Sequence, residues 1–346
     1  MSLVCRIHAA NDLRLEQDPD PALGPHDVRM ALGAGGICGS DMHYYRHAAV
    51  GSFAMREPLI PGHEVSGVVA EVGSAVRRVK PGDKVAVNPS HACGACSYCL
   101  GGRFNLCREM RFLGSASVWP HMQGMFRERF VMAEAQLTPV PEPVSLGEIA
   151  CAEPLSIGLH AVHRAGGALL GKTVLVTGAG TIGCMSIIAA RLAGASRVIA
   201  CDIADRALAI AATVGADETL RSDQTDPAAL ADIADIAIEA AGNPAALATC
   251  LRATRRGGRI VQVGTLPAEG LQFPANSIMA RELDYVGAFR AAHAFGWAVD
   301  ALRSGRVDVR PLISAQLPLS RARDAFELAA DRSRSTKVQV VADAAA

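Results

Sequence analysis

Residues 173–183 read TVLVTGAGTIG, and the fold of the second half of the chain follows from this stretch. A continuous apolar run is followed at once by Gly178, Gly180 and Gly183, and then by the helical pattern of TIGCMSIIAARLAGA. In a nucleotide-binding βαβ unit the first glycine makes the turn, the second lets the backbone approach a pyrophosphate, and the third lets the helix pack on the strand. The motif is weak by itself, but its position between strand and helix predicts a dinucleotide site formed by Gly178, Gly180, Thr181, Ile182 and Gly183.

The choice of cofactor is predicted from Asp202, which ends the next apolar run, RVIAC. A carboxylate at this position accepts hydrogen bonds from the adenosine ribose and repels a 2′-phosphate, so it favours NAD over NADP. The alternative role for Asp202 is to cap the helix predicted for IADRALAI. Arg206 keeps NADP open as the less favoured cofactor.

The chain has two regions with different sequence patterns. After residue 153, apolar strands alternate with helical stretches, which predicts a doubly wound parallel sheet with helices on both faces. From about residue 25 to 140, short β-rich stretches such as HDVRMALG, EVSGVVAEVG and RERFVMA are separated by Gly and Pro. This pattern predicts a barrel-like all-β domain, so the fold class is α/β with two domains.

The composition narrows the class of protein. The 346 residues suffice for about two domains, and half of them are hydrophobic, which excludes disorder. The 34 basic residues balance the 34 acidic ones, so the chain lacks the positive field of a protein that binds nucleic acid or a membrane surface. We find neither a membrane-spanning apolar run nor a signal-peptide core in the sequence. We expect a soluble, cytoplasmic protein with no nucleic-acid or membrane partner.

Four of the ten cysteines follow the spacing C-x2-C-x2-C-x7-C in HACGACSYCLGGRFNLC. In a reducing cytoplasm such spacing indicates metal binding rather than disulfides. Four thiolates fill every tetrahedral position of a zinc ion, so we predict a structural zinc site in a lobe at about residues 91–108. An iron–sulfur cluster is the alternative, and it would colour the protein. The predicted ligands are Cys93, Cys96, Cys99 and Cys107.

Further chemical residues are scattered through the first region. Cys38 lies in GICGSDMHYY, His63 and Glu64 lie in PGHEVSG, and Glu153 lies in CAEPLSIGLHA. Each has a purely structural explanation, but beside a nucleotide domain they predict an open zinc site with a position left for a substrate oxygen. The sequence leaves open whether Glu64 or Glu153 is the third ligand.

The order GICGSDMH, PGHEVSGVV, four-cysteine lobe, AEPLSIGLHA and VTGAGTIG resembles the zinc-dependent medium-chain dehydrogenases across essentially the whole chain. The acid at Glu153, where the alcohol dehydrogenase branch usually has cysteine, is similar to the polyol branch typified by sorbitol dehydrogenase. NPSHACGACSYC and MRFLGSASVWPHMQGMF are similar to the L-idonate 5-dehydrogenases.

This resemblance implies a particular organisation. Residues 1–153 and 289–346 would form a GroES-like β-barrel catalytic domain, with a Rossmann NAD-binding domain at residues 154–288 inserted between them. Substrate would bind in the interdomain cleft. Each subunit would hold two zinc ions and NAD, and the subunits would form a homodimer or homotetramer.

The resemblance also implies a reaction. A zinc-bound alcohol loses its proton more readily than a free one. Ser40 would lie beside the reacting oxygen, and the proton would leave through the nicotinamide ribose and His43, whose imidazole titrates near neutrality. The leading reaction is oxidation of carbon 5 of L-idonate to 5-keto-D-gluconate with NAD, or its reverse. A neutral polyol such as sorbitol is the alternative substrate.

A sugar acid carries a carboxylate, and a buried carboxylate needs a cationic or hydrogen-bonding partner. The predicted charged partners are Arg111, His121 and Arg290, and His121 is as well explained as an exposed loop residue. Outside this enzyme class, we consider a zinc-ribbon nucleic-acid protein and a non-catalytic nucleotide-binding structural protein. By resemblance, further substrate and cofactor contacts are Tyr44, Phe112, Ser115, Glu153, Val263 and Arg290.

Overall fold

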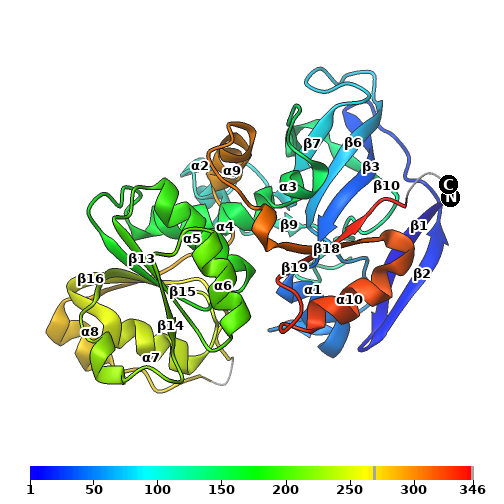
Figure 1. The fold of residues 1–346 in the computed structure, drawn as a ribbon. Helices are drawn as coiled ribbons and strands as arrows, with labels where there is room; N and C mark the ends of the chain where they lie inside the picture. Colours follow the sequence, from blue (N-terminus) through cyan, green and yellow to red (C-terminus); the bar gives the residue numbers. More distant parts are fainter. Residues whose placement is uncertain (268–269, 344–346) are drawn as a thin grey trace. The chain divides into compact units, whose positions relative to one another are not determined.

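The computed structural model describes residues 1–267 and 270–343 and divides the chain into two compact units (Figure 1). The sequence predicts domain boundaries after residue 153 and before residue 289. In the structure the first unit's N-terminal segment ends at Glu153, and residues 289–298 belong to the second unit. The last three residues of the predicted stretch 289–346 lie outside the described residues. Unit 1 comprises Met1–Glu153, Val299–Gly305 and Ile313–Ala346, and unit 2 comprises Pro154–Ala298 and Arg306–Leu312.

Unit 2 contains a six-stranded parallel sheet in the order β14-β13-β12-β15-β16-β17. The strand order reverses beside β12, and in such sheets ligands bind at the carboxyl ends of the strands at this switch point. The strands are β12 (Thr173–Thr177), β13 (Arg197–Asp202), β14 (Glu218–Arg221), β15 (Ala234–Glu239), β16 (Thr254–Gln262) and β17 (Asp284–Gly287).

Helices cover both faces of this sheet, as Figure 1 shows. The middle residues of the central strands are mostly apolar because both faces of the sheet are buried, and Leu175, Ile199, Ala237 and Ile260 are fully inaccessible. The helices are α4 (Ala152–Ala165), which begins at the end of unit 1, α5 (Thr181–Leu192), α6 (Asp205–Thr213), α7 (Pro244–Ala253) and α8 (Ala275–Arg281).

Unit 1 is built on a seven-stranded sheet in the order β11-β7-β6-β3-β19-β18, with β10 also paired to β3. The last strand of the chain, β19, pairs antiparallel with β3, so the C-terminal residues complete the sheet that the N-terminal residues begin. The strands are β3 (Asp27–Gly36), β6 (Glu64–Val72), β7 (Lys84–Val87), β10 (Arg129–Ala133), β11 (Leu137–Pro139), β18 (Ile313–Pro318) and β19 (Lys337–Val341).

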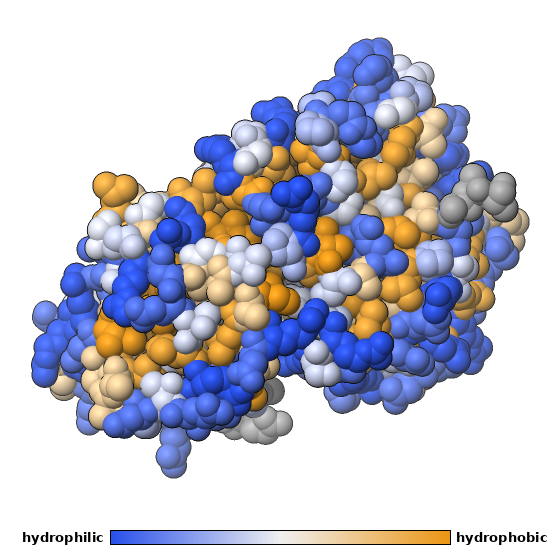
Figure 2. Space-filling view, viewed as in Figure 1, coloured by the Kyte–Doolittle hydropathy of each residue, from blue (hydrophilic) through white to orange (hydrophobic). Residues whose placement is uncertain are grey.

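The remaining helices and strands are not part of these two sheets. No helix in the described part of the chain is long and apolar enough to cross a membrane. On the face drawn in Figure 2, hydrophilic residues dominate and hydrophobic ones are interspersed. These elements are β1 (Ser2–Ala9), β2 (Asp12–Asp18), α1 (Gly39–His47), β4 (Ala49–Val50), β5 (Phe53–Ala54), β8 (Ser90–His91), α2 (Ser97–Leu100), η1 (Phe104–Leu106), β9 (Arg111–Phe112), η2 (Glu134–Gln136), α3 (Leu146–Ala150), η3 (Pro227–Leu230), α9 (Ala294–Arg303), η4 (Arg310–Leu312), η5 (Leu319–Arg321) and α10 (Ala322–Ala330).

Candidate active site

The register of β3 and β6 brings the first set of predicted ligands together. Gly36, the last residue of β3, pairs with Glu64, the first residue of β6. Cys38 follows two residues after β3 and caps α1, while His63 directly precedes β6. Cys38 Sγ, a ring nitrogen of His63 and a carboxylate oxygen of Glu64 consequently lie within 4.8 Å of one another.

Asp41, which the sequence places in the same GICGSDMHYY stretch without a predicted role, lies beside two of these residues. Its Oδ2 accepts a hydrogen bond of 2.9 Å from the Cys38 N–H, and its Oδ1 accepts one of 3.1 Å from the Gly62 N–H. The same Oδ1 lies 3.7 Å from Nδ1 of His63. Carboxylates in this position orient the imidazole ligands of metal sites. The available signal was the spacing of Asp41 three residues after Cys38, which is the capping-box spacing of a helix start.

The donor set fits zinc. A thiol, an imidazole and a carboxylate are typical zinc ligands, and three of them leave one tetrahedral position for a substrate. Among the described residues, Nδ1 of the buried His63 has no hydrogen-bond partner. Burial disfavours the charged imidazole, but the Asp41 carboxylate and the Cys38 thiol outweigh it and hold the pKa of His63 well above its usual range. A cation at the ring is thus favoured by its surroundings.

The two candidate glutamates differ in their surroundings. Glu64 belongs to the 4.8 Å set, and its Oε2 lies 2.6 Å from Nζ of Lys337. Glu153 lies outside that set, in the first turn of α4, and is buried. Burial, together with the nearby Glu64, raises the pKa of Glu153 to about 7 against the opposing effect of His63.

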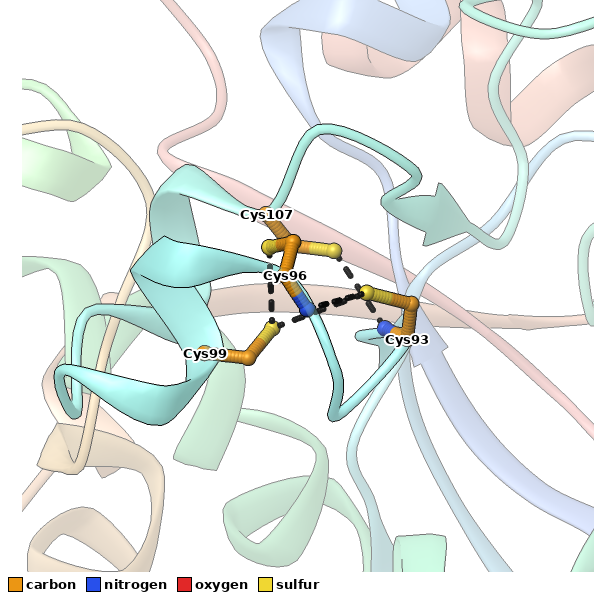
Figure 3. Close-up of side chains that lie close together, drawn as sticks. All are labelled: Cys93, Cys96, Cys99 and Cys107. Carbon is orange, nitrogen blue, oxygen red and sulfur yellow. Dashed lines mark hydrogen bonds between the residues drawn. The ribbon is translucent and has the colours of Figure 1, made fainter.

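The four-cysteine lobe forms a second metal-binding geometry (Figure 3). The Sγ atoms of Cys96 and Cys99 are 3.6 Å apart, and those of Cys93 and Cys99 are 3.9 Å apart. Four sulfurs at about 2.3 Å from a tetrahedral zinc ion would be separated by about 3.8 Å. Backbone N–H groups, first that of Arg108, lower the pKa of the Cys96 thiol to about 6. The lobe therefore has the sulfur spacing that a zinc ion requires.

The glycines after β12 have the three properties that their motif requires. Gly178 has a φ of +84°, which other residues rarely adopt. A Cβ on Gly183 would overlap the carbonyl oxygen of Gly178, so only glycine permits this contact between helix and turn. A Cβ on Gly180, at the start of α5, would meet nothing within 4 Å. That open space before a helix N-terminus fits an approaching pyrophosphate.

Asp202 ends β13 and accepts three backbone hydrogen bonds. Its Oδ2 receives the N–H of Ala179 at 2.6 Å, and its Oδ1 receives those of Ile203 and Ala204 at 2.7 and 2.9 Å. Asp202 therefore links the glycine turn to the loop before α6 by hydrogen bonds. Its predicted hydrogen bonds to the adenosine ribose would be additional to these. Arg206 is exposed on α6.

Two predicted cofactor contacts lie farther along unit 2. The N–H of Val263 donates to the carbonyl oxygen of Glu239, across the ends of β16 and β15. Arg290 has a φ of +56°, and its guanidinium lies 4.9 Å from the centroid of the Phe289 ring.

The predicted substrate-wall residues belong to unit 1. The ring centroid of Phe112 lies 5.3 Å from that of His63, so this side chain borders the candidate zinc site. Tyr44 is buried, and its hydroxyl accepts the N–H of Ala116 at 2.9 Å. Ser115 Oγ accepts the N–H of Ser117.

Two of the predicted carboxylate partners are disfavoured by their surroundings. Nδ1 of His121 bonds to the carbonyl oxygen of Val118, and Nε2 accepts the N–H of Arg56, so both ring nitrogens are engaged within the protein. His121 is buried rather than an exposed loop residue. Arg111 directly precedes Phe112 in β9, and successive strand residues point to opposite faces. Nε of Arg111 contacts Sδ of Met122 at 3.3 Å.

The predicted proton path begins on α1. Ser40 lies in its first turn, two residues after Cys38, and His43 lies one turn further on. His43 is exposed, and desolvation together with the nearby cations His47, Arg332 and Arg46 lowers its pKa.

Comparisons with known proteins agree with this architecture. Residues 24–142 match the alcohol dehydrogenase GroES-like domain, and residues 181–304 match the zinc-binding dehydrogenases. The L-idonate 5-dehydrogenase of Vitis vinifera is 37% identical, over 92% of this chain and 88% of the relative. The sorbitol dehydrogenase of Gallus gallus is 35% identical, over 99% of this chain and 97% of the relative. The crystal structure of L-idonate 5-dehydrogenase from Escherichia coli matches with a TM-score of 0.93 and 34% identity, over 98% of both chains.

The chain therefore belongs to the zinc-dependent medium-chain dehydrogenases, a class of alcohol dehydrogenases that use zinc and a nicotinamide cofactor. Its relatives place it among the enzymes of this family that act on polyols and sugar acids. The predicted fold class, a GroES-like domain combined with a doubly wound Rossmann domain, is confirmed.

Proposed function

We propose that this enzyme oxidises carbon 5 of L-idonate to 5-keto-D-gluconate with NAD, or catalyses the reverse reaction. The observation that carries the proposal is the convergence of Cys38, His63 and Glu64 within 4.8 Å, in a chain whose relatives include L-idonate 5-dehydrogenases. When bound there, zinc supplies a Lewis acid that favours loss of the alcohol proton. Glu153 would stand beside these ligands as a further carboxylate.

The remaining roles belong to side chains of the protein. Ser40 would accept the hydrogen bond of the substrate hydroxyl and pass its proton toward His43. The exposure of His43 supports this role, because a proton there can leave to water. Asp41 would keep the His63 ring oriented. Asp202 would bind the adenosine ribose and favour NAD over NADP.

Arg290 is our proposed partner for the carboxylate of the substrate. A non-glycine residue with positive φ is strained, and such residues cluster at functional sites.

The test is growth of NADH absorbance near 340 nm when the protein is mixed with NAD and either L-idonate or sorbitol. We expect higher kcat/KM for L-idonate. Arg290→Ala should lower kcat/KM for L-idonate about tenfold more than kcat/KM for sorbitol, since a charge-assisted hydrogen bond to the substrate carboxylate contributes about 1.5–3 kcal/mol, whereas loss of the predicted cofactor contact lowers both values alike. Arg111→Ala is the matched control and should affect neither substrate strongly.

The second candidate is oxidation of a neutral polyol such as sorbitol, which the sorbitol dehydrogenase relatives favour. A wild-type preference for sorbitol would make this the correct assignment. Equal losses on both substrates in Arg290→Ala would mean that Arg290 does not recognise the carboxylate. We further propose a homodimer or homotetramer, which sedimentation analysis would distinguish.

A further inference from the structure

A buried ion pair borders the candidate zinc site. Nζ of Lys337 lies 2.6 Å from Oε2 of Glu64, and the side chains are only 3% and 2% exposed. The same Nζ donates a hydrogen bond of 2.9 Å to the carbonyl oxygen of Ile37, the residue before Cys38. Lys337 therefore contacts the two chain segments that carry Cys38, His63 and Glu64.

The sheet register explains how the C-terminal strand reaches the site. Lys337 begins β19, which pairs with the end of β3, and Gly36 of β3 pairs in turn with Glu64. The lysine thus crosses β3 to reach the carboxylate. Glycine at position 36 leaves room for this crossing, because a Cβ there would lie 3.2 Å from Cδ of Lys337 and would collide with the Glu64 carboxylate.

The ammonium group of Lys337 and a bound zinc ion would both interact with the negative charge of Glu64. In the described part of the chain, Glu64 is the carboxylate that forms an ion pair with Lys337. A buried carboxylate that loses its cation is strongly destabilised, so Lys337 stabilises Glu64 when no metal is bound. A zinc ion bound by Cys38 and His63 would be attracted to the same Glu64 carboxylate. The zinc ion and the Lys337 ammonium would then lie near one carboxylate and repel each other.

We propose that Lys337 is a positioning residue that competes with zinc for Glu64 and thereby weakens zinc binding at the catalytic site. The lysine acts as a built-in counter-ion that keeps the metal-free site folded. This inference rests on the proposed zinc site, and the experiment below separates the two.

The test measures zinc affinity of the purified protein by competition with a chromogenic chelator. Cys38→Ser identifies the catalytic-site signal, because it removes a ligand there and leaves the four-cysteine lobe intact. We expect Lys337→Met and Lys337→Gln to bind the catalytic zinc about tenfold more tightly than wild type. Their metal-free forms should unfold at lower temperature, and zinc should restore more of this loss than it does in wild type. Lys337→Gln retains hydrogen-bond donors and decides the question if Lys337→Met does not fold.

Two controls accompany these variants. Lys84 lies in β7 of the same sheet and pairs with Glu142 at 2.5 Å, so Lys84→Met removes a more exposed cation away from the site and should leave zinc affinity unchanged. Lys337→Arg keeps the charge and should retain the wild-type affinity.

Unchanged or weaker zinc binding in Lys337→Gln would overturn the proposed competition, as would an equal loss of stability with and without zinc. A different result would contradict the zinc site itself: if Cys38→Ser still bound two zinc ions, the proposed ligand set would be wrong whatever the Lys337 variants showed.

Discussion

Asp41 and Asp202 each accept hydrogen bonds from backbone N–H groups and also lie at a predicted binding site. Asp41 accepts N–H groups from Cys38 and Gly62 and faces the ring of His63. Asp202 accepts three N–H groups at the edge of the nucleotide turn. Backbone donors make it less costly to withdraw a carboxylate from water, so these acids can be held still where a ligand has to be oriented. Replacing either residue will therefore change local structure as well as chemistry.

At Asp202 we predict a change of cofactor preference. Asp202→Asn removes the charge that repels a 2′-phosphate and keeps one acceptor oxygen for the loop. The ratio of kcat/KM with NADP to that with NAD should rise about tenfold or more, because one charged contact contributes about 1.5–3 kcal/mol. Steady-state kinetics with both cofactors would check this.

The control for this prediction is Asp202→Ala, which also removes the three backbone contacts. It should lower thermal stability in addition to shifting the cofactor ratio. A wild-type enzyme that already prefers NADP would show that Asp202 serves the loop rather than the ribose.

Among the elements, the β12–α5 turn restricts its glycines in different ways. Gly183 touches the carbonyl oxygen of Gly178 so closely that no side chain fits, whereas Gly180 faces open space. The same motif thus contains one glycine required by packing and another whose absent side chain leaves space for a ligand.

We predict that substitutions at these two glycines have different effects. Gly183→Ala should destabilise unit 2 by about 1–3 kcal/mol or more, since the added methyl group collides with backbone. Gly180→Ala should leave stability nearly unchanged and weaken NADH binding, because its methyl group would occupy the space expected for the pyrophosphate. Denaturant titration and NADH fluorescence titration would measure the two effects. Equal loss of stability in both variants would contradict this division.

For the whole molecule, the two metal-binding clusters have different expected roles. Cys38, His63 and Glu64 come from separated segments joined by the central sheet, while the four cysteines lie within one short lobe. An open site contributes chemistry, whereas a site with four protein ligands contributes folding energy.

We expect Cys38→Ser to abolish turnover and leave a folded protein with one zinc ion per subunit. Cys96→Ser should lower stability or disturb assembly. Metal analysis, thermal unfolding and activity would be measured on both variants. Fewer than two zinc ions in carefully prepared wild-type protein would contradict the two-site description.

The parts of this protein that local patterns encode were predicted well. The alternation of apolar strands and helices indicated the Rossmann sheet, and the cysteine spacing indicated the lobe, because these features depend on neighbours along the chain. Local patterns contain no signal for which unit residues 289–298 pack against, and in the structure these residues belong to unit 2. The oligomeric state and the cytoplasmic location stay predictions.

The sequence by itself determined the family, the nucleotide turn and the types of ligand available to zinc, since each depends on residue identity at short spacing. Only the tertiary structure decided which distant groups meet. The pairing of β19 with β3 and of β3 with β6 brings Lys337 to Glu64, and the fold of the loop before β10 engages both ring nitrogens of His121. Contacts of this kind depend on strand register and burial, which bring together residues hundreds of positions apart. Such contacts produce no periodic pattern in the local sequence, so they cannot be predicted from it.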